Sequence, residues 1–156
     1  MNRDKKNVKI CLVSSSGGHY EQLKMLKKLS ENHDIFYVTE KTGYDMQSKY
    51  TVRQDVGGRI SMMLTLCINL FKALSIWSKE KPDVVISTGT TTALPFILLA
   101  KILRKKVIYI ETFARVYGGT KAARFVYKHH LYDLFIYQWE TQKDEYPNGV
   151  YGGGIY

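Results

Sequence analysis

The sequence predicts a doubly wound, mostly parallel α/β domain of the Rossmann-like class, with residues 1–156 forming a single domain. Short apolar runs rich in β-branched residues alternate with helical patterns, which indicates right-handed βαβ units. Runs such as VVIS and VIYI are apolar throughout, which is typical of strands in a sheet covered on both faces. The length of 156 residues and the hydrophobic content of 45% suit one globular domain.

The strands and helices follow one another in a regular order. The predicted strands are Val8–Ser14, Asp34–Thr39, Asp83–Ser87, Lys106–Ile110 and Tyr132–Gln138, with a weaker one at Thr51–Val56. A helical pattern follows the first strand, formed by Leu23, Met25, Leu26 and Leu29. Pro95 suits the first turn of a later helix, where a proline is tolerated.

The segment Ser61–Trp77 is predicted to form an apolar helix with one narrow polar stripe. The stripe consists of Ser61, Thr65, Asn69 and Lys72. Such a helix would be roughly 25 Å long, shorter than the ~30 Å hydrocarbon core of a bilayer, so we expect no membrane-spanning helix. Two interpretations remain open: a core helix of the domain, or a helix lying in a membrane interface.

Ligands of open α/β sheets bind outside the carboxyl ends of the strands. The stretches in this position are Ser14–His19, Ser87–Thr92, Glu111–Gly119 and the residues from Trp139 onward. In the first of these, Ser16, Gly17, Gly18 and His19 lead into a helix, which predicts a backbone cradle for phosphate. The alternative is a tight turn in which the glycines serve backbone geometry alone. Neither the Walker pattern nor the G-x-G-x-x-G dinucleotide pattern occurs here.

The second stretch offers hydroxyl groups and a glycine at the start of another helix. Thr88, Gly89 and Thr90 are its candidate ligand-binding residues. Simple N-capping by threonine is the alternative for this loop taken alone. Because two such loops follow neighbouring strands, together they favour a diphosphate or a nucleotide-like ligand.

His19 and Glu111 are the candidate catalytic residues. Imidazole accepts a proton near neutral pH, so His19 is a candidate general base toward an acceptor hydroxyl, or else it only holds its loop. Glu111 is the only acid among residues 101–130, and it can orient a sugar hydroxyl or act as a base. Arg115 is either a further substrate-binding residue or the ion-pair partner of Glu111. No histidine has metal-ligand spacing to a partner, so we expect no metal.

The net charge of +9 is unevenly distributed along the chain. Residues 101–130 contain eight Lys/Arg and one acid, which indicates an anionic partner. Lys121, Arg124 and Lys128 fall on one face of a helix predicted within residues 120–130 and suit an acidic lipid surface. Nucleic acid would suit the same charges, but no nucleic-acid-binding motif accompanies them and we expect none.

The N-terminal residues MNRDKKN run directly into the first strand, so no secretory signal peptide is predicted. The two cysteines, Cys11 and Cys67, lie in apolar runs without metal-ligand spacing. We interpret both as reduced core residues of a cytoplasmic protein.

Four segments in this order resemble one known family: SSSGGHYEQL, PDVVISTGTTTALP, KVIYIETFARV, and DLFIYQWE with YPNGVYGGG. They resemble the acceptor-side subunit of split GT-B, MurG-like glycosyltransferases, the CpsF/PssD-type proteins of capsule and exopolysaccharide synthesis. The chain is similar too to the eukaryotic subunit that anchors UDP-GlcNAc transferase activity in dolichol-linked oligosaccharide synthesis. The resemblance covers nearly the whole chain.

The resemblance implies a domain equivalent to the N-terminal half of a GT-B enzyme. A partner subunit would bind the UDP-sugar donor, and this chain would bind a lipid-diphosphate-linked saccharide, so we expect no activity alone and no cofactor. Gly17, Gly18 and His19 would contact the diphosphate and supply the base, with Thr88–Thr90 as the second loop and Glu111 as the acidic residue. We expect the protein at the inner face of the cytoplasmic membrane, attached peripherally. A non-catalytic membrane-docking scaffold that recruits the transferase is the alternative.

Overall fold

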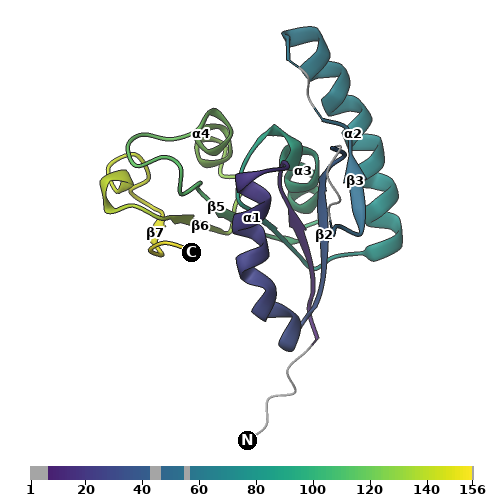
Figure 1. Ribbon diagram of the computed structural model, residues 1–156, viewed down its shortest axis with the longest axis horizontal. Coiled ribbons are helices and arrows are strands. Elements are labelled where there is room, and N and C mark those ends of the chain that lie inside the picture. Colours follow the sequence, from purple (N-terminus) through teal and green to yellow (C-terminus); the bar gives the residue numbers. More distant parts are fainter. Residues whose placement is uncertain (1–6, 43–46, 55–56, 156) are drawn as a thin grey trace, which may run out of the picture.

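The computed structural model describes residues 7–42, 47–54 and 57–155, and its strands form one seven-stranded sheet (Figure 1). The strand order is β3-β2-β1-β4-β5-β6-β7, and every neighbouring pair is parallel. The strands are β1 Lys9–Val13, β2 Asp34–Glu40, β3 Tyr50–Val52, β4 Val84–Ser87, β5 Lys106–Ile110, β6 Leu134–Tyr137 and β7 Val150–Tyr151. This confirms the predicted doubly wound α/β class.

The predicted strands recur within one or two residues at most ends. The weak strand expected at Thr51–Val56 is the short edge strand β3, and Asp55 and Val56 lie outside the described residues. The edge strand β7 was not predicted, because two exposed residues give no periodic signal.

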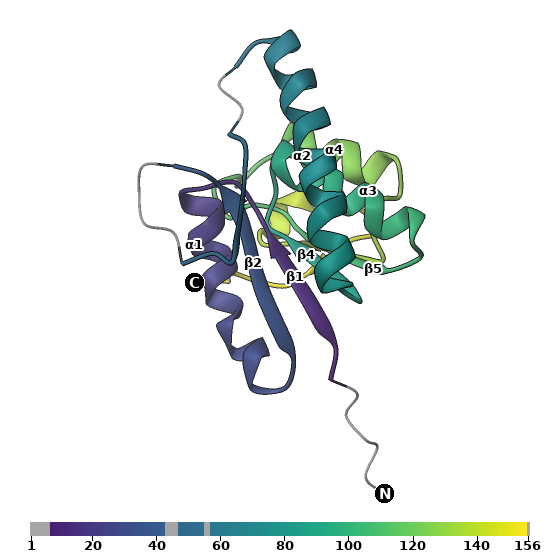
Figure 2. The same cartoon turned by 90° about the vertical axis from the view of Figure 1, so that its right-hand side faces the viewer.

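Helices cover both faces of the sheet. The helical segments are α1 Gly18–Lys24, η1 Met25–Glu31, α2 Arg59–Glu80, η2 Thr91–Ala93, α3 Leu94–Ile102, α4 Lys121–Lys128 and η3 Glu140–Gln142. Figures 1 and 2 show α1 on one face of the sheet and α2, α3 and α4 on the other. Pro95 lies in the first turn of α3, as predicted.

Alternate residues of the central strand β1 divide the core between these two faces. Cys11 and Val13 belong to the larger cluster, under α2 and α3, and Ile10 and Leu12 belong to a smaller one that includes Leu23 of α1. This alternation follows from the two-residue period of a strand, and it places helix-covered apolar side chains on both faces.

Helix α2 is longer than the sequence indicated. Its 22 residues correspond to about 33 Å, so the expected shortfall against a bilayer core is wrong. By length and composition it is the one helix among the described residues that could cross a membrane. Its C-terminal half packs into the core through Ala73, Ile76 and Trp77. Its first turns project beyond the carboxyl edge of the sheet in both ribbon views (Figures 1 and 2).

A buried carboxylate fastens the other end of α2 to the amino edge of the sheet. Glu80 accepts ion pairs from Lys9 at 2.6 Å and Lys49 at 2.7 Å, and a hydrogen bond from the Tyr50 hydroxyl at 2.5 Å. The hydrogen-bonded ammonium of Lys49, followed by those of Lys9 and the Tyr50 hydroxyl, lowers the pKa of Glu80 to about 2. This cluster is structural, since it lies at the edge opposite the predicted ligand site.

Candidate functional site

The first two predicted loops meet at the carboxyl edge of the sheet, because β1 and β4 are neighbours. The imidazole Nδ1 of His19 lies 2.7 Å from the carbonyl oxygen of Thr88, and the Thr88 hydroxyl donates to the carbonyl oxygen of His19 at 2.7 Å. The two loops therefore hold each other through a reciprocal pair of hydrogen bonds.

This pairing also determines the tautomer of His19. A carbonyl oxygen can only accept, so Nδ1 must carry the proton that it donates to Thr88. In the neutral ring, Nε2 is then the nitrogen with a free lone pair. The side chain is only partly buried. The arrangement suits a general base at Nε2, and it also fits the alternative that His19 holds its loop, through Nδ1.

The glycines of the first loop leave their backbone amides open. Gly17 has a φ of 75°, and a Cβ added at Gly17 or Gly18 would meet no atom within 4 Å. In the described part of the chain, no protein acceptor pairs with either amide N–H. Ser16 differs from this pattern, because its amide and hydroxyl both face the carboxylate of Glu40, at 3.4 and 3.3 Å. The cradle expected from residues 16–19 is thus open at the two glycines and closed at the serine.

The second loop has an unusual backbone beside the histidine. Gly89 has a φ of 117°, and a Cβ there would lie 3.2 Å from the His19 ring carbon Cε1 and 3.4 Å from the Tyr109 hydroxyl. Thr90 has a φ of 77°, which is uncommon for a residue other than glycine. Such strained conformations concentrate at functional sites. Gly89 is required here for two reasons, its left-handed backbone and the space taken by the imidazole.

Glu40 is a polar residue of this site that the sequence did not single out. It ends β2, the strand next to β1, and is 6% exposed. Besides Ser16 in the first loop, it accepts a hydrogen bond from the hydroxyl of Thr92 in the second. The signal was available: an acid at the carboxyl end of a predicted strand meets the same rule that selected the other stretches.

Glu111, the second candidate catalytic residue, follows β5 and is enclosed by the surrounding chain. It is 0% exposed, and its carboxylate accepts hydrogen bonds from the amide of Thr112, from the amide and hydroxyl of Thr120, and from the Tyr146 hydroxyl at 2.7 Å. Burial, with the adjacent Glu111 carboxylate, raises the pKa of Tyr146 well above its usual value. With four internal donors and no exposed surface, Glu111 holds the loop of residues 112–120 rather than lying open to a ligand.

The predicted alternative for Glu111, an ion pair with Arg115, is wrong. Arg115 is exposed, and among the residues described its side chain is not one of the donors to Glu111. The carbonyl oxygen of the intervening residue Thr112 accepts from the amide of Arg115 at 3.3 Å, which closes a turn. No bond in the described part of the structure directs the guanidinium of Arg115 to either loop, and its substrate role stays a prediction.

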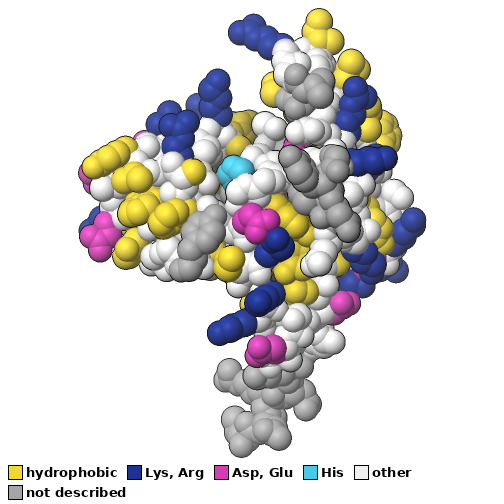
Figure 3. Space-filling view, viewed as in Figure 1, with side chains coloured by type: hydrophobic (Ala, Val, Ile, Leu, Met, Phe, Trp, Pro, Cys, Tyr) yellow, Lys and Arg dark blue, Asp and Glu magenta, His cyan; other side chains and the backbone are white. Residues whose placement is uncertain are grey.

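The predicted basic helix is α4, and its three cations are exposed. Lys121, Arg124 and Lys128 recur at helical spacing on one side, and Lys and Arg side chains gather over α4 in the space-filling view (Figure 3). Arg124 pairs with Glu145 at 2.6 Å, which reduces the net charge of this surface. Thr120 caps the helix by accepting from the amide of Ala123 at 3.1 Å.

Helix α2 has the reverse of the usual sidedness. Two members of the polar stripe, Thr65 and Asn69, are buried, whereas the apolar residues around them are exposed. We call the exposed set the apolar face of α2: Ile60, Met63, Leu64, Ile68, Leu70, Phe71 and Leu74. Figure 3 shows apolar side chains along this helix. The core-helix interpretation is therefore wrong for the N-terminal two thirds of α2.

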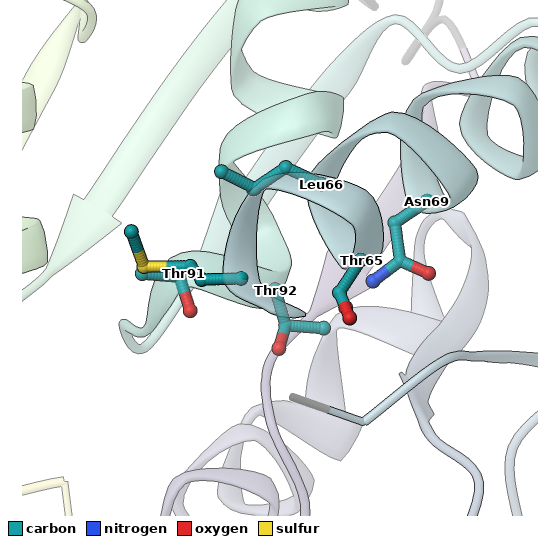
Figure 4. Close-up of a pocket in the computed structure, with 6 residues that line it drawn as sticks. Thr65, Leu66, Asn69, Thr91 and Thr92 are labelled. Atoms are coloured by element: carbon teal, nitrogen blue, oxygen red, sulfur yellow. The ribbon is translucent and has the colours of Figure 1, made fainter. Parts of the chain in front are cut away.

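The buried stripe explains how α2 is held with its apolar side outward. The Asn69 amide accepts from the backbone N–H of Arg53 at 2.8 Å and donates to the carbonyl of Arg53 at 2.9 Å. Thr65 lines a shallow recess together with Thr91 and Thr92, in which the polar ends of Thr65 and Asn69 lie on the side of α2 that faces the sheet (Figure 4). The Thr65 hydroxyl is buried without a partner in the described structure.

The cysteine prediction is half correct. Cys11 is fully buried and free, but Cys67 is free and exposed beside the apolar face of α2. Both errors concerning α2 have the same cause, since an apolar surrounding in the sequence does not reveal which side of a helix faces inward.

Comparison with known proteins agrees with the fold and identifies relatives. Residues 43–155 match the family model described as "Oligosaccharide biosynthesis protein Alg14 like". The chain is 32% identical over 123 residues to the UDP-N-acetylglucosamine transferase subunit ALG14 of Rattus norvegicus, covering 75% of this chain and 56% of the relative. The protein of that name from Homo sapiens is 27% identical over 184 residues, with coverages of 97% and 84%. The chain thus spans little more than half the length of the rat relative.

Solved structures of two enzymes have the same fold. The UDP-GlcNAc 2-epimerase of Methanocaldococcus jannaschii superposes with a TM-score of 0.69 at 18% identity, over 89% of this chain and 42% of that one. The MurG protein of Acinetobacter baumannii gives a TM-score of 0.63 at 18% identity, over 85% and 41%. The domain corresponds to about half of a GT-B-type enzyme.

Proposed function

The chain belongs to the Alg14-like family of oligosaccharide biosynthesis proteins, and from that premise we propose that it is one subunit of a two-component UDP-N-acetylglucosamine transferase. The observation that carries the proposal is the reciprocal pairing of His19 with Thr88, which brings a histidine with a free Nε2 to open glycine amides at the carboxyl edge of the sheet. The transferase activity itself is taken from the names of the relatives.

We assign the acceptor side of the reaction to this chain and the donor side to a partner subunit. The domain corresponds to about two fifths of the MurG and epimerase chains, which supports a second domain of similar size across a cleft. The acceptor is a polyprenyl-diphosphate-linked saccharide. Its diphosphate accepts hydrogen bonds from the open amides of Gly17 and Gly18, where small residues allow close approach.

His19 is the general base of the transfer. The acceptor hydroxyl oxygen attacks the anomeric carbon of the donor sugar while Nε2 of His19 takes the hydroxyl proton. The bond between the anomeric carbon and the UDP oxygen breaks, UDP leaves with the bonding electrons, and the anomeric configuration inverts. Thr88 holds Nδ1 and so keeps Nε2 directed at the acceptor. Glu111 contributes by fixing the neighbouring loop.

The same edge of the molecule is the side that meets the membrane. The apolar face of α2 begins at Ile60, in the turns that project beyond the carboxyl edge. Lys and Arg side chains gather over α4 on the same side of the molecule (Figure 3). Apolar side chains insert at the acyl boundary, and lysines contribute ~1 kcal/mol each near acidic lipid. We place the protein on the inner face of the cytoplasmic membrane, in capsule or exopolysaccharide synthesis, where His19 is directed to a lipid-linked acceptor.

Reconstitution tests this assignment. The chain and its donor-binding partner are purified separately and together, and transfer of labelled N-acetylglucosamine from UDP-GlcNAc to a polyprenyl-diphosphate-linked acceptor is measured. We expect transfer only when both chains are present. Transfer by the partner alone at the same rate would contradict the proposal.

The apolar face of α2 favours a second candidate function, a non-catalytic scaffold that docks the transferase on the membrane. Both functions require the partner and the membrane. They differ in the acceptor site: the scaffold predicts that changes at Gly17, Gly18 and His19 leave turnover intact, whereas the catalytic subunit predicts its loss.

A further inference from the structure

Glu40 connects the two loops of the site through contacts that are separate from the His19–Thr88 pair. One carboxylate oxygen, Oε2, lies 3.4 Å from the amide nitrogen and 3.3 Å from the hydroxyl of Ser16. The other, Oε1, accepts from the hydroxyl of Thr92, which is 4% exposed. A single side chain from β2 therefore contacts the residue just before the glycines of one loop and the end of the turn that follows Thr90 in the other.

The chemistry of this carboxylate distinguishes it from Glu80, the buried acid at the opposite edge of the sheet. Glu80 is equally buried, but two lysines balance its charge. Glu40 makes no ion pair with any cation in the described part of the chain, and all its donors are neutral. A buried carboxylate without a cation is costly to a fold, so its three hydrogen bonds must be kept for the charge to be tolerated. The hydrogen bonds that stabilise the carboxylate therefore also hold the two loops together.

Glu40 and the His19–Thr88 pair join the same two loops. Gly17 and Gly18 separate Ser16 from His19, and Thr88 and Thr92 bound the strained pair Gly89–Thr90. The frame has two ties: Glu40 fixes Ser16 to Thr92, and the reciprocal bonds fix His19 to Thr88. Loss of the first tie leaves the separation of these loops to the His19–Thr88 bonds. The residue that supplies the base would then also have to fix the distance between the loops.

We propose that Glu40 is a positioning residue of the acceptor site, which sets the separation of the two loops and thereby the direction of His19 Nε2. The inference rests on the proposed function. Glu40 acts through His19 rather than by contact with substrate, because its carboxylate is enclosed by the loops that it joins. Since Ser16 donates to Glu40, the diphosphate is bound at Gly17 and Gly18, away from the carboxylate that would repel it.

The test compares Glu40→Gln with Glu80→Gln in the assembled two-subunit complex, measuring kcat and the KM values for acceptor and donor, with folding checked by circular dichroism. Glutamine keeps the volume and removes the charge. We expect Glu40→Gln to lower kcat by about 10- to 100-fold, the effect of a small misplacement of a catalytic group, with the donor KM unchanged. Glu80→Gln lowers stability and leaves the kcat of the folded complex within about two-fold, since its cluster lies at the opposite edge.

A second variant, Thr92→Val, keeps the carboxylate and removes one loop from it, so the inference stays testable should Glu40→Gln fail to fold. Thr92→Val is expected to lower kcat to a similar degree. The double variant is expected to be no more than about three-fold slower than the slower single variant, because both break the same tie. An unchanged kcat in Thr92→Val, equal losses in Glu40→Gln and Glu80→Gln, or fully multiplicative losses in the double variant would each overturn the inference. Transfer by the partner alone at the full rate, the contrary result of the reconstitution above, would overturn the proposed function, and the Glu40 variants take no part in that measurement.

Discussion

Replacing exposed apolar residues on α2 is expected to release the protein from acidic membranes without unfolding it. The change is Met63→Ser, Leu64→Ser and Phe71→Ser together, at side chains that are 65%, 57% and 72% exposed. Complete burial of such a side chain is worth about 1.5–3 kcal/mol, so the exposed fractions leave about 1–2 kcal/mol each for insertion. The triple change therefore removes about 3–6 kcal/mol, which corresponds to a partition constant roughly 10²- to 10⁴-fold lower.

Flotation with vesicles that contain acidic phospholipid measures this partition. Ile102→Ser is the matched control, because Ile102 is 73% exposed but ends α3, whose C-terminus leads to the amino edge of the sheet. We expect the control to float like the wild type. The free energy of unfolding of both variants should lie within about 0.5 kcal/mol of the wild-type value, since surface changes have small effects. A triple variant that floats as well as the wild type would refute the reasoning.

Three further changes probe contacts at the two edges of the sheet and under α2. Glu80→Gln is expected to cost about 1–3 kcal/mol at pH 7, where the carboxylate with its lowered pKa is ionised. Because the pKa of Glu80 is depressed in the folded protein, this stability is present above the unfolded pKa near 4.5 and is lost as the pH falls toward about 2. Urea denaturation at pH 7 and at about pH 2 should therefore show the difference in unfolding free energy between wild type and Glu80→Gln closing at the lower pH. Gly89→Ala is expected to cost about 1–3 kcal/mol from its φ of 117° and to slow transfer by displacing His19; an active, unperturbed variant would contradict the crowding described at this position. Thr65→Val, an isosteric change that removes a buried hydroxyl without a partner, should leave the urea midpoint equal or higher, and a marked fall would mean that the hydroxyl is hydrogen-bonded.

The sequence predicted the sheet well because its strands carry strong local signals. The run Lys106–Ile110 is predicted and observed with identical ends, and the glycine- and threonine-rich loops follow β1 and β4 as expected. The rule that ligands lie beyond the carboxyl ends of strands then brought His19 and Thr88 to the same place. Contacts between these two residues follow from topology, so they were within reach of the sequence.

The sidedness of α2 and the surroundings of Glu111 were not within reach. Periodicity shows that Thr65 and Asn69 share a face, but only the backbone of Arg53 shows that this face is turned inward. Glu111 is enclosed by Tyr146, which arrives from 35 residues later in the chain. A spacing pattern carries no information about such a distant contact, so the enclosure of Glu111 by Tyr146 could not be predicted.

The most direct test of the central claim is sugar transfer by the assembled complex that carries His19→Asn. Asparagine can still donate an amide N–H to the Thr88 carbonyl, as Nδ1 does, but it lacks the basic Nε2. We predict that the complex assembles and binds acceptor lipid while its turnover falls about 10²- to 10⁴-fold. Full turnover by this variant would contradict the assignment of His19 as the base.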